Sequence, residues 1–353
     1  MNEQDKVKEI LDHIQNAGGA DFHWEEDALF GALSKQDSNQ SSLSIKLLSI
    51  LGGVLASGAF VAFLGIAGLF DSEVALFLFG IAGVGIAIWL DRTYDKLSTD
   101  TLSVSIFFIG FILMLAGLLQ MKVDANIISV IFILMSVGTL FFTQNYILSF
   151  LSVLIFCGSV LSFIPINEVY QLLHAYTIVL AILLSYIMLN EARLITISKK
   201  LAVLYDPARI ALIISFLFAL IGFGKRHLIP LSIEYNWVST LGLFLITTYV
   251  IWRIFDLLGI QQVGIKIIVY LLSIAITIAT AYAPAIMGSI LVMLLSFWVN
   301  YKTGLAFGVI AMTYFIGQYY YDLDLTLLTK SIILFASGWL FLGLYWMTRT
   351  QDQ

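Results

Sequence analysis

Long apolar runs separated by short polar stretches dominate the chain from residue 47 onward. A helix that crosses a bilayer needs about 20 predominantly apolar residues, within a range of about 17–25. The pattern predicts twelve such helices, several of them near the short end of this range. The predicted spans are Leu47–Phe70, Val74–Leu90, Leu102–Leu119, Asn126–Phe142, Tyr146–Ile164, His174–Leu189, Arg209–Phe223, Trp237–Ile254, Ile265–Tyr282, Ala285–Val299, Thr303–Tyr319 and Leu327–Met347.

The runs are continuous, whereas a membrane β-strand alternates apolar and polar positions over about 9–11 residues. Helices satisfy every backbone hydrogen bond within one segment, as a lipid environment requires. We therefore predict an all-α fold, a polytopic transmembrane helix bundle of about twelve spans over residues 47–347. A long loop at Asn190–Ala208 divides it into halves at 47–189 and 209–347, and residues 348–353 form a short cytoplasmic tail.

Prolines and glycines are expected at two kinds of position in this bundle. Pro165, Pro207 and Pro284 are expected to mark turns at the ends of spans. Glycines within the spans are expected to let neighbouring helices approach closely. These glycines are Gly52, Gly53, Gly58, Gly80, Gly83, Gly85, Gly304 and Gly308.

Composition agrees with a membrane protein. Hydrophobic residues make up 60% of the 353 residues and charged residues 12%, compared with about 45–50% and about 25% in soluble domains. A net charge of −5 argues against a nucleic-acid partner. The bilayer itself is the expected environment.

The basic residues predict the orientation. With twelve spans, fourteen of the eighteen Lys and Arg residues fall on the side that carries both termini, and four fall on the other side. Because cytoplasmic loops are enriched in Lys and Arg, both termini are predicted to lie in the cytoplasm. The predicted location is thus a bacterial cytoplasmic (inner) membrane. Residues 1–46 show no cleavable signal peptide, so the first span is expected to act as the targeting signal.

Residues 1–46 form a distinct acidic segment with four Lys and nine Asp or Glu. An apolar stripe at helical spacing predicts a small cytoplasmic amphipathic helix, followed by a Ser-, Gln- and Asn-rich linker. Its acidic character disfavours anionic lipid head groups. The stripe either packs on the bundle or docks a separate partner, and its residues are Val7, Ile10, Leu11 and Ile14.

Charged residues within the spans are rare and lie near span ends, where they are candidates for a site. Arg253 and Asp256 are three residues apart and are expected to form an ion pair on the cytoplasmic side. Lys330 lies at the start of the last span, where the positive end of the helix dipole disfavours a cation. It is either a snorkelling lysine in an aromatic belt or part of a polar site at the outer face. The candidate outer-face residues are Tyr319, Tyr320, Tyr321, Asp322, Asp324 and Lys330.

The sequence offers little catalytic chemistry. Four histidines, His13, His23, His174 and His227, lack the spacing of metal ligands. Cys157, in an apolar run, is expected to be a small core residue. Neither nucleotide-binding loops nor a nucleophile elbow occur. We expect no enzyme activity, cofactor or metal.

The C-terminal third contains the stretch Tyr319-Tyr-Tyr-Asp-Leu-Asp-Leu-Thr-Leu-Leu-Thr-Lys-Ser331, followed by an apolar run with Gly338. This stretch resembles the closing signature of a bacterial membrane family catalogued as domain of unknown function 4401. Further similar stretches are Leu51-Gly-Gly-Val-Leu-Ala56, Asp256-Leu-Leu-Gly259 and Ala283-Pro-Ala-Ile-Met-Gly288. The resemblance covers most of residues 45–347, but Ala285 stands where a glycine is expected. It implies a periplasmic companion domain in some members and no established activity.

Two functions follow as expectations. The first is a non-catalytic membrane component that acts at the cell envelope through a membrane or periplasmic protein partner. The second is a secondary transporter or permease for an apolar or weakly polar solute. A polar cavity in the middle of the membrane would favour transport, and a closed, dry bundle would favour the partner role.

Overall fold

The structure is a computed structural model that describes residues 43–66, 68–93, 97–143, 145–224, 231 and 235–322, together with residues 335, 338, 339 and 342. These residues form twelve α-helices, one short 3-10 helix (Leu69–Asp71) and no strand. The helices are α3 (Leu43–Ile66), α4 (Glu73–Thr93), α5 (Leu97–Gln120), α6 (Ala125–Phe142), α7 (Tyr146–Ile166), α8 (Leu172–Leu189), α9 (Glu191–Ile197), α10 (Lys199–Ile221), α11 (Asn236–Leu257), α12 (Val263–Ala279), α13 (Pro284–Trp298) and α14 (Lys302–Asp322). The predicted all-α fold is confirmed.

Seven of the described helices are long and apolar enough to cross a membrane: α4, α5, α6, α7, α8, α10 and α11. The apolar helices α12 and α13 are shorter. Each of the first eleven predicted spans falls on a helix. Of the predicted span Leu327–Met347, only residues 335, 338, 339 and 342 are described, and the predicted amphipathic stripe of residues 7–14 lies outside the described residues.

The predicted loop Asn190–Ala208 is wrong, because this stretch is helical. It forms the short helix α9 and the first part of α10, separated by Ser198. The Ser198 side chain accepts a hydrogen bond from the Leu201 backbone N–H at 3.2 Å and so caps α10. Pro207 lies inside α10 rather than before it. Its ring removes one backbone donor, and burial of Tyr205 and Arg209 beside it holds the helix together.

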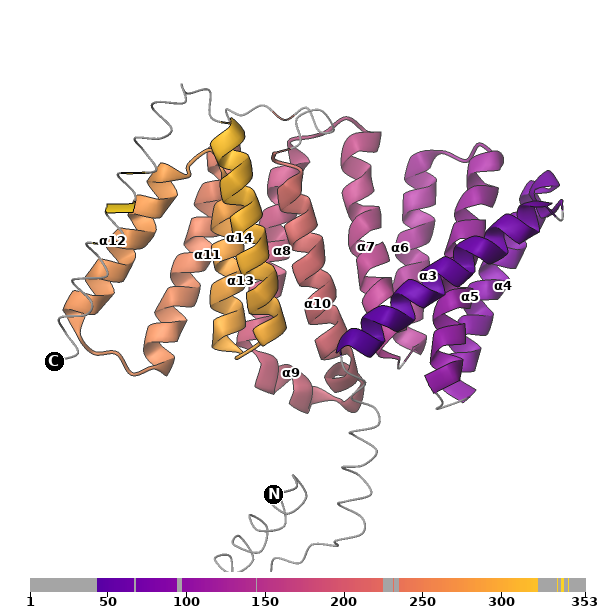
Figure 1. The fold of residues 1–353 in the computed structure, drawn as a ribbon, viewed down its shortest axis with the longest axis horizontal. Coiled ribbons are helices and arrows are strands. Elements are labelled where there is room, and N and C mark those ends of the chain that lie inside the picture. The colour runs from indigo at the N-terminus through magenta and orange to yellow at the C-terminus, as the bar shows by residue number, and fades with distance from the viewer. Residues whose placement is uncertain are drawn as a thin grey trace, which may run out of the picture.

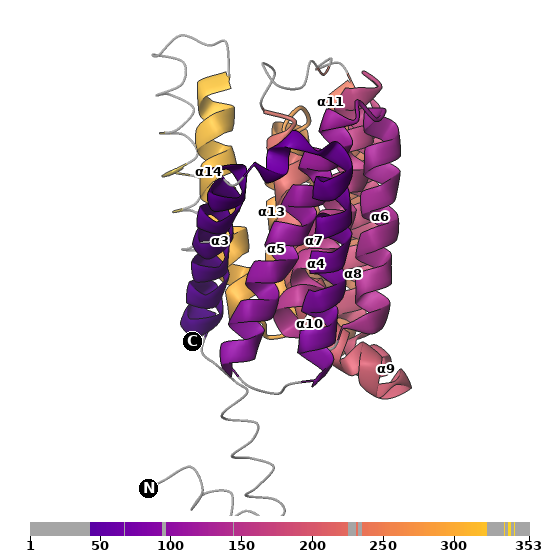
Figure 2. The same cartoon turned by 90° about the vertical axis from the view of Figure 1, so that its right-hand side faces the viewer.

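Consecutive long helices run alternately up and down (Figure 1). One end of the bundle carries α9, the last turns of α4, α6 and α11, and the first turns of α10, α12 and α14; we call it the α9 end. The opposite end carries the turn between α5 and α6 and is called the Lys122 end. Seen from the side, α3 and α14 lie on the same face of the bundle (Figure 2).

Two buried cores share one helix. The larger core joins residues of α7, α8, α10, α11, α13 and α14, and the smaller joins residues of α4, α5, α6 and α7. From α7, Ile147, Leu148 and Leu151 enter the smaller core, whereas Val153, Cys157 and Ile164 enter the larger. Cys157 is buried, as predicted. Helix α7 therefore connects the two parts of the bundle.

Glycines bring α4 and α5 into backbone contact. A Cβ atom on Gly80 would lie 2.5 Å from the Met114 backbone nitrogen, and one on Gly110 would lie 2.8 Å from the Val84 nitrogen. Gly117 approaches Phe77 in the same way. The predicted packing role is confirmed for Gly80 and Gly83, and also for Gly304 and Gly308, which face α13. It is wrong for Gly52, Gly58 and Gly85, which face open space.

Hydrogen bonds between side chains join α6 to α7. Asn126 and Asn167 exchange reciprocal amide hydrogen bonds of 3.1 and 2.7 Å near the Lys122 end. The hydroxyls of Ser129 and Ser162 are 2.7 Å apart, and those of Thr139 and Ser152 are 2.6 Å apart. Three polar contacts thus connect the two helices from one end to the other.

Candidate functional site at the α9 end

Among the charged residues that the structure describes, Arg209 is the most deeply buried. Its side chain comes from α10, and only 7% of the residue is exposed. Glu191 reaches it from the first residue of α9, Asp206 from the preceding turn of α10, and Tyr301 from the connection between α13 and α14. Arg209 therefore ties α9 and α10 to the connection between α13 and α14, which is distant from them in the sequence.

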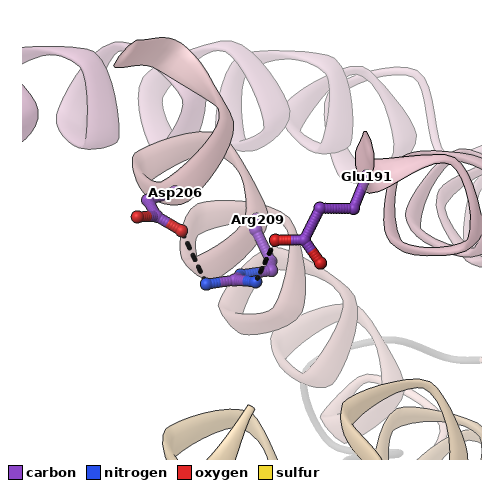
Figure 3. Close-up of polar contacts among 3 residues, drawn as sticks. All are labelled: Glu191, Asp206 and Arg209. Atoms are coloured by element: carbon purple, nitrogen blue, oxygen red, sulfur yellow. Dashed lines mark hydrogen bonds and ion pairs between the residues drawn. The ribbon is translucent and has the colours of Figure 1, made fainter. Parts of the chain in front are cut away.

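The guanidinium of Arg209 contacts two carboxylates, as Figure 3 shows. Nη2 donates to Asp206 Oδ1 at 2.6 Å, and Nη1 lies 3.6 Å from Glu191 Oε1. The ring centroid of Tyr301 is 3.9 Å from the guanidinium carbon, and that of Tyr205 is 5.0 Å away. Such cation–π contacts are strengthened where water is excluded.

The site places one cation, Arg209, between two carboxylates, Glu191 and Asp206. Desolvation raises the pKa of Glu191, and the positive charge of Arg209 opposes that rise. Desolvation is likewise the largest cause of the raised pKa of Tyr301, which keeps its phenol protonated. The site therefore holds a neutralised guanidinium next to a carboxylate that is held partly out of water.

Four buried polar atoms in and beside the Arg209 site have no hydrogen-bond partner: Tyr205 Oη, Arg209 Nε, Ser296 Oγ and Tyr301 Oη. Ser296 lies next to Tyr301, whose backbone N–H donates to the Ser296 carbonyl at 2.7 Å. An unsatisfied buried polar group costs about 1–3 kcal/mol. A water molecule or a small polar group at these atoms would remove that cost.

Other basic residues at the α9 end also contact aromatic rings. Arg92 Nε donates to the Phe142 carbonyl at 2.7 Å, and Lys200 Nζ donates to the Phe141 carbonyl at 2.6 Å. Each cation also lies over the ring of the same phenylalanine. These two cations satisfy carbonyl groups at the negative end of the α6 dipole. They fix the end of α6 between α4 and α10.

The predicted outer-face site lies only partly within the described residues. Tyr319, Tyr320 and Tyr321 occupy the last turn of α14, and the rings of Tyr320 and Tyr321 are 5.7 Å apart. Tyr321 is strongly exposed. The side chain of Asp322, and residues Asp324 and Lys330, lie outside the described part, so this site stays a prediction.

Arg253 and Asp256 lie near the end of α11, but the structure does not bring them together as an ion pair. The Arg253 guanidinium lies 5.7 Å from the centroid of the Trp298 ring, and its Nε has no hydrogen-bond partner. Asp256 is exposed. The candidate docking residues Val7, Ile10, Leu11 and Ile14 lie outside the described residues.

His174 is buried in α8. Its Nδ1 lies 2.7 Å from the Ser239 hydroxyl, and its ring packs 5.2 Å from that of Phe223. His13, His23 and His227 lie outside the described residues. In the part of the chain that the structure describes, no group of three or more His, Cys, Asp or Glu residues is placed to hold a metal ion.

The site around Arg209 was not predicted from the sequence, where Arg209 is only one of the basic residues that indicate the orientation. One local signal exists, because Asp206 and Arg209 have the i, i+3 spacing that brings two side chains together on a helix. The spacing is informative only if both residues lie on one helix, which means that α10 must begin before Pro207. The contacts with Glu191 and Tyr301 depend on tertiary packing alone.

The long apolar helices, together with the cations Arg92, Lys200 and Arg209 at one end of the bundle, are typical of a multi-pass membrane protein. The chain belongs to the family described as domain of unknown function (DUF4401), whose match covers residues 42–350. No curated protein and no solved structure matches the chain.

Proposed function

We propose that the protein is an integral cytoplasmic-membrane protein of about twelve spans with the α9 end in the cytoplasm. The described basic residues support this orientation, since α9 and the helix ends beside it carry Arg92, Arg193, Lys199, Lys200, Arg209, Arg253, Lys266 and Lys302. Lys122 lies in the turn at the opposite end. Such an asymmetry is typical of the cytoplasmic side.

Within this topology, the proposed role is that of a non-catalytic component that works through protein partners at the cell envelope. The observation that carries this role is the exposure of α9. None of its seven residues is buried, although the Glu191–Arg209 contact holds its first turn against the bundle. Ile195 and Ile197 are exposed, and so are Leu201 and Val203 in the following turns. A fixed helix with exposed apolar side chains next to cations suits a docking surface.

Site-specific photo-cross-linking in native membranes tests this role. A photo-cross-linking residue at position 197 is expected to capture a discrete protein. The same residue at position 127, which is comparably exposed on α6 near the Lys122 end, is the matched control and is expected to capture lipid. Cross-linking to lipid alone at both positions would contradict the partner role, because α9 would then be a helix that rests in the membrane interface.

A second candidate, transport of a weakly polar solute, is favoured by one observation. The larger core contains unpartnered buried polar atoms at both ends, His174 Nε2 and Asn236 Oδ1 at the Lys122 end and the atoms around Arg209 at the α9 end. Thr247 lies between them on α11 and is buried. Thr247→Cys in a Cys157→Ser background would react with a water-soluble maleimide if an aqueous route reached the core. Absence of labelling, with labelling of an exposed control cysteine, would favour the partner role.

A further inference from the structure

A groove lies on the surface of the bundle between α5, α6 and α7. Its volume is about 410 Å³. Carbon atoms line most of it, and Ser129, Ser159 and Ser162 are among its lining residues. The remaining lining residues include Leu119 of α5, Ala125 and Phe132 of α6, and Ile155, Gly158 and Ile166 of α7.

The groove exists because the consecutive helices α5 and α6 pack against different neighbours. Glycine contacts hold α5 against α4, whereas the asparagine and hydroxyl pairs hold α6 against α7. Although α5 and α6 are joined by a short turn, each packs mainly on another partner. The space between them is left open, and Gly158 adds to it because a Cβ atom there would meet nothing within 4 Å.

We propose that this groove binds one acyl chain of a zwitterionic phospholipid. All three lining helices are long and apolar enough to cross a membrane, so the groove opens toward hydrocarbon rather than water. Along α7 it extends from Ile155 to Ile166, which at about 1.5 Å per residue is about 16 Å. One leaflet contributes about 15 Å to a hydrocarbon core about 30 Å thick. The groove therefore matches the length of a chain from the leaflet at the Lys122 end.

Charges at the end of the groove match a phospholipid head group. Lys122 lies in the turn between the lining residues Leu119 and Ala125, and its side chain is exposed. It is placed to contact a lipid phosphate. Asp124 lies two residues further on, where its carboxylate accepts a hydrogen bond from the Asn126 N–H at 2.8 Å. This carboxylate disfavours a net negative head group and suits the ammonium of an ethanolamine lipid.

Native mass spectrometry of the full chain tests the proposal, after reconstitution in bilayers of phosphatidylethanolamine and phosphatidylglycerol. The wild-type protein is expected to retain one ethanolamine lipid through detergent exchange. Gly158→Leu places a side chain in the groove and is expected to weaken this retention about tenfold, because the leucine side chain takes space that the acyl chain would occupy. Gly85→Leu is the matched control, since Gly85 also faces open space but lies on α4, outside the groove.

Lys122→Gln tests the head-group contact separately and is expected to weaken retention about two- to fivefold, the range of an exposed charge pair. A thermal midpoint equal to that of wild type shows that each variant is folded. Retention by Gly158→Leu equal to wild type would overturn the proposal, as would equal losses in Gly158→Leu and Gly85→Leu. Dissociation of a stable dimer by Gly158→Leu would instead assign the groove to a second copy of the chain and would also overturn it.

Discussion

The α4–α5 and α6–α7 contacts are two different solutions to the same problem. Helices in lipid gain little from hydrophobic burial, so packing and hydrogen bonds must hold them together. Glycines bring the backbones of α4 and α5 within van der Waals contact. Between α6 and α7, hydroxyl and amide groups bond across the interface at 2.6–3.1 Å.

The difference between these contacts has a consequence for the whole N-terminal part of the bundle. A backbone contact fails when a side chain is added, whereas a hydrogen-bonded contact fails when polarity is removed. Because the two contacts pull α5 and α6 apart, the groove between them follows from both. Variants at either interface can therefore separate volume from polarity as the source of stability.

Gly110→Leu is expected to have the largest effect. Its Cβ atom would lie within 3 Å of backbone and side-chain atoms of α4, which cannot move aside independently. We expect a loss of about 3 kcal/mol in the free energy of unfolding, at the upper end for overpacking. Reversible unfolding in detergent micelles measures it. Gly85→Leu on the facing helix should remain stable, and equal losses in both would mean that backbone contact is not the cause.

Thr139→Val and Ser152→Ala test the hydrogen-bonded interface at its most buried pair, whose oxygens are 2.6 Å apart. A double-mutant cycle should give a coupling of about 1 kcal/mol, between the average of about 0.6 and the maximum of about 1.7 measured for helices in membranes. The same unfolding assay gives the four free energies needed. Additive losses would show that the hydroxyls are satisfied by their own helices and do not join α6 to α7.

Glu168→Gly concerns the end of α7, beside the Asn126–Asn167 pair. Glu168 adopts a left-handed backbone conformation with φ of 57°, which costs a non-glycine residue about 1–2 kcal/mol. Glycine removes that cost but loses more chain entropy on folding, by about 0.5–1 kcal/mol. A net gain of about 0.5 kcal/mol is expected, visible as a higher thermal midpoint. A lower midpoint would show that the Glu168 side chain stabilises the turn.

Glu191→Gln is expected to have the smallest effect. It distinguishes the α9 end from the α4–α5 and α6–α7 contacts, because the pairs named above for those contacts contain no ionisable group whose charge changes with pH. Because the folded-state pKa of Glu191 is raised, its contribution to stability is present at low pH and is lost as the pH rises through that pKa. Glutamine resembles the protonated form, so the variant should match wild type at low pH and equal or slightly exceed it at neutral pH. Thermal midpoints against pH measure this, and a clearly lower midpoint for the variant at neutral pH would show that the ion pair outweighs desolvation.

The apolar pattern alone determined the helical fold and the place of most helices, because lipid leaves a backbone no hydrogen-bond partner except itself. Glycines such as Gly80 were correctly predicted to pack between helices, but the sequence does not distinguish them from Gly85, which faces open space. That distinction depends on how α4 is rotated against α5.

Three features were decided by the tertiary structure. Pro207 predicted a boundary, yet α10 continues through it since burial of Tyr205 and Arg209 outweighs one lost hydrogen bond. From the sequence, Arg209 only contributed to the predicted orientation, whereas the packed structure places Glu191 and Tyr301 against it. No sequence pattern predicts the groove, because it results from the packing of α5 on α4 and of α6 on α7. Local sequence specifies what each helix can contact, and only the packing of all helices together selects which contact is made.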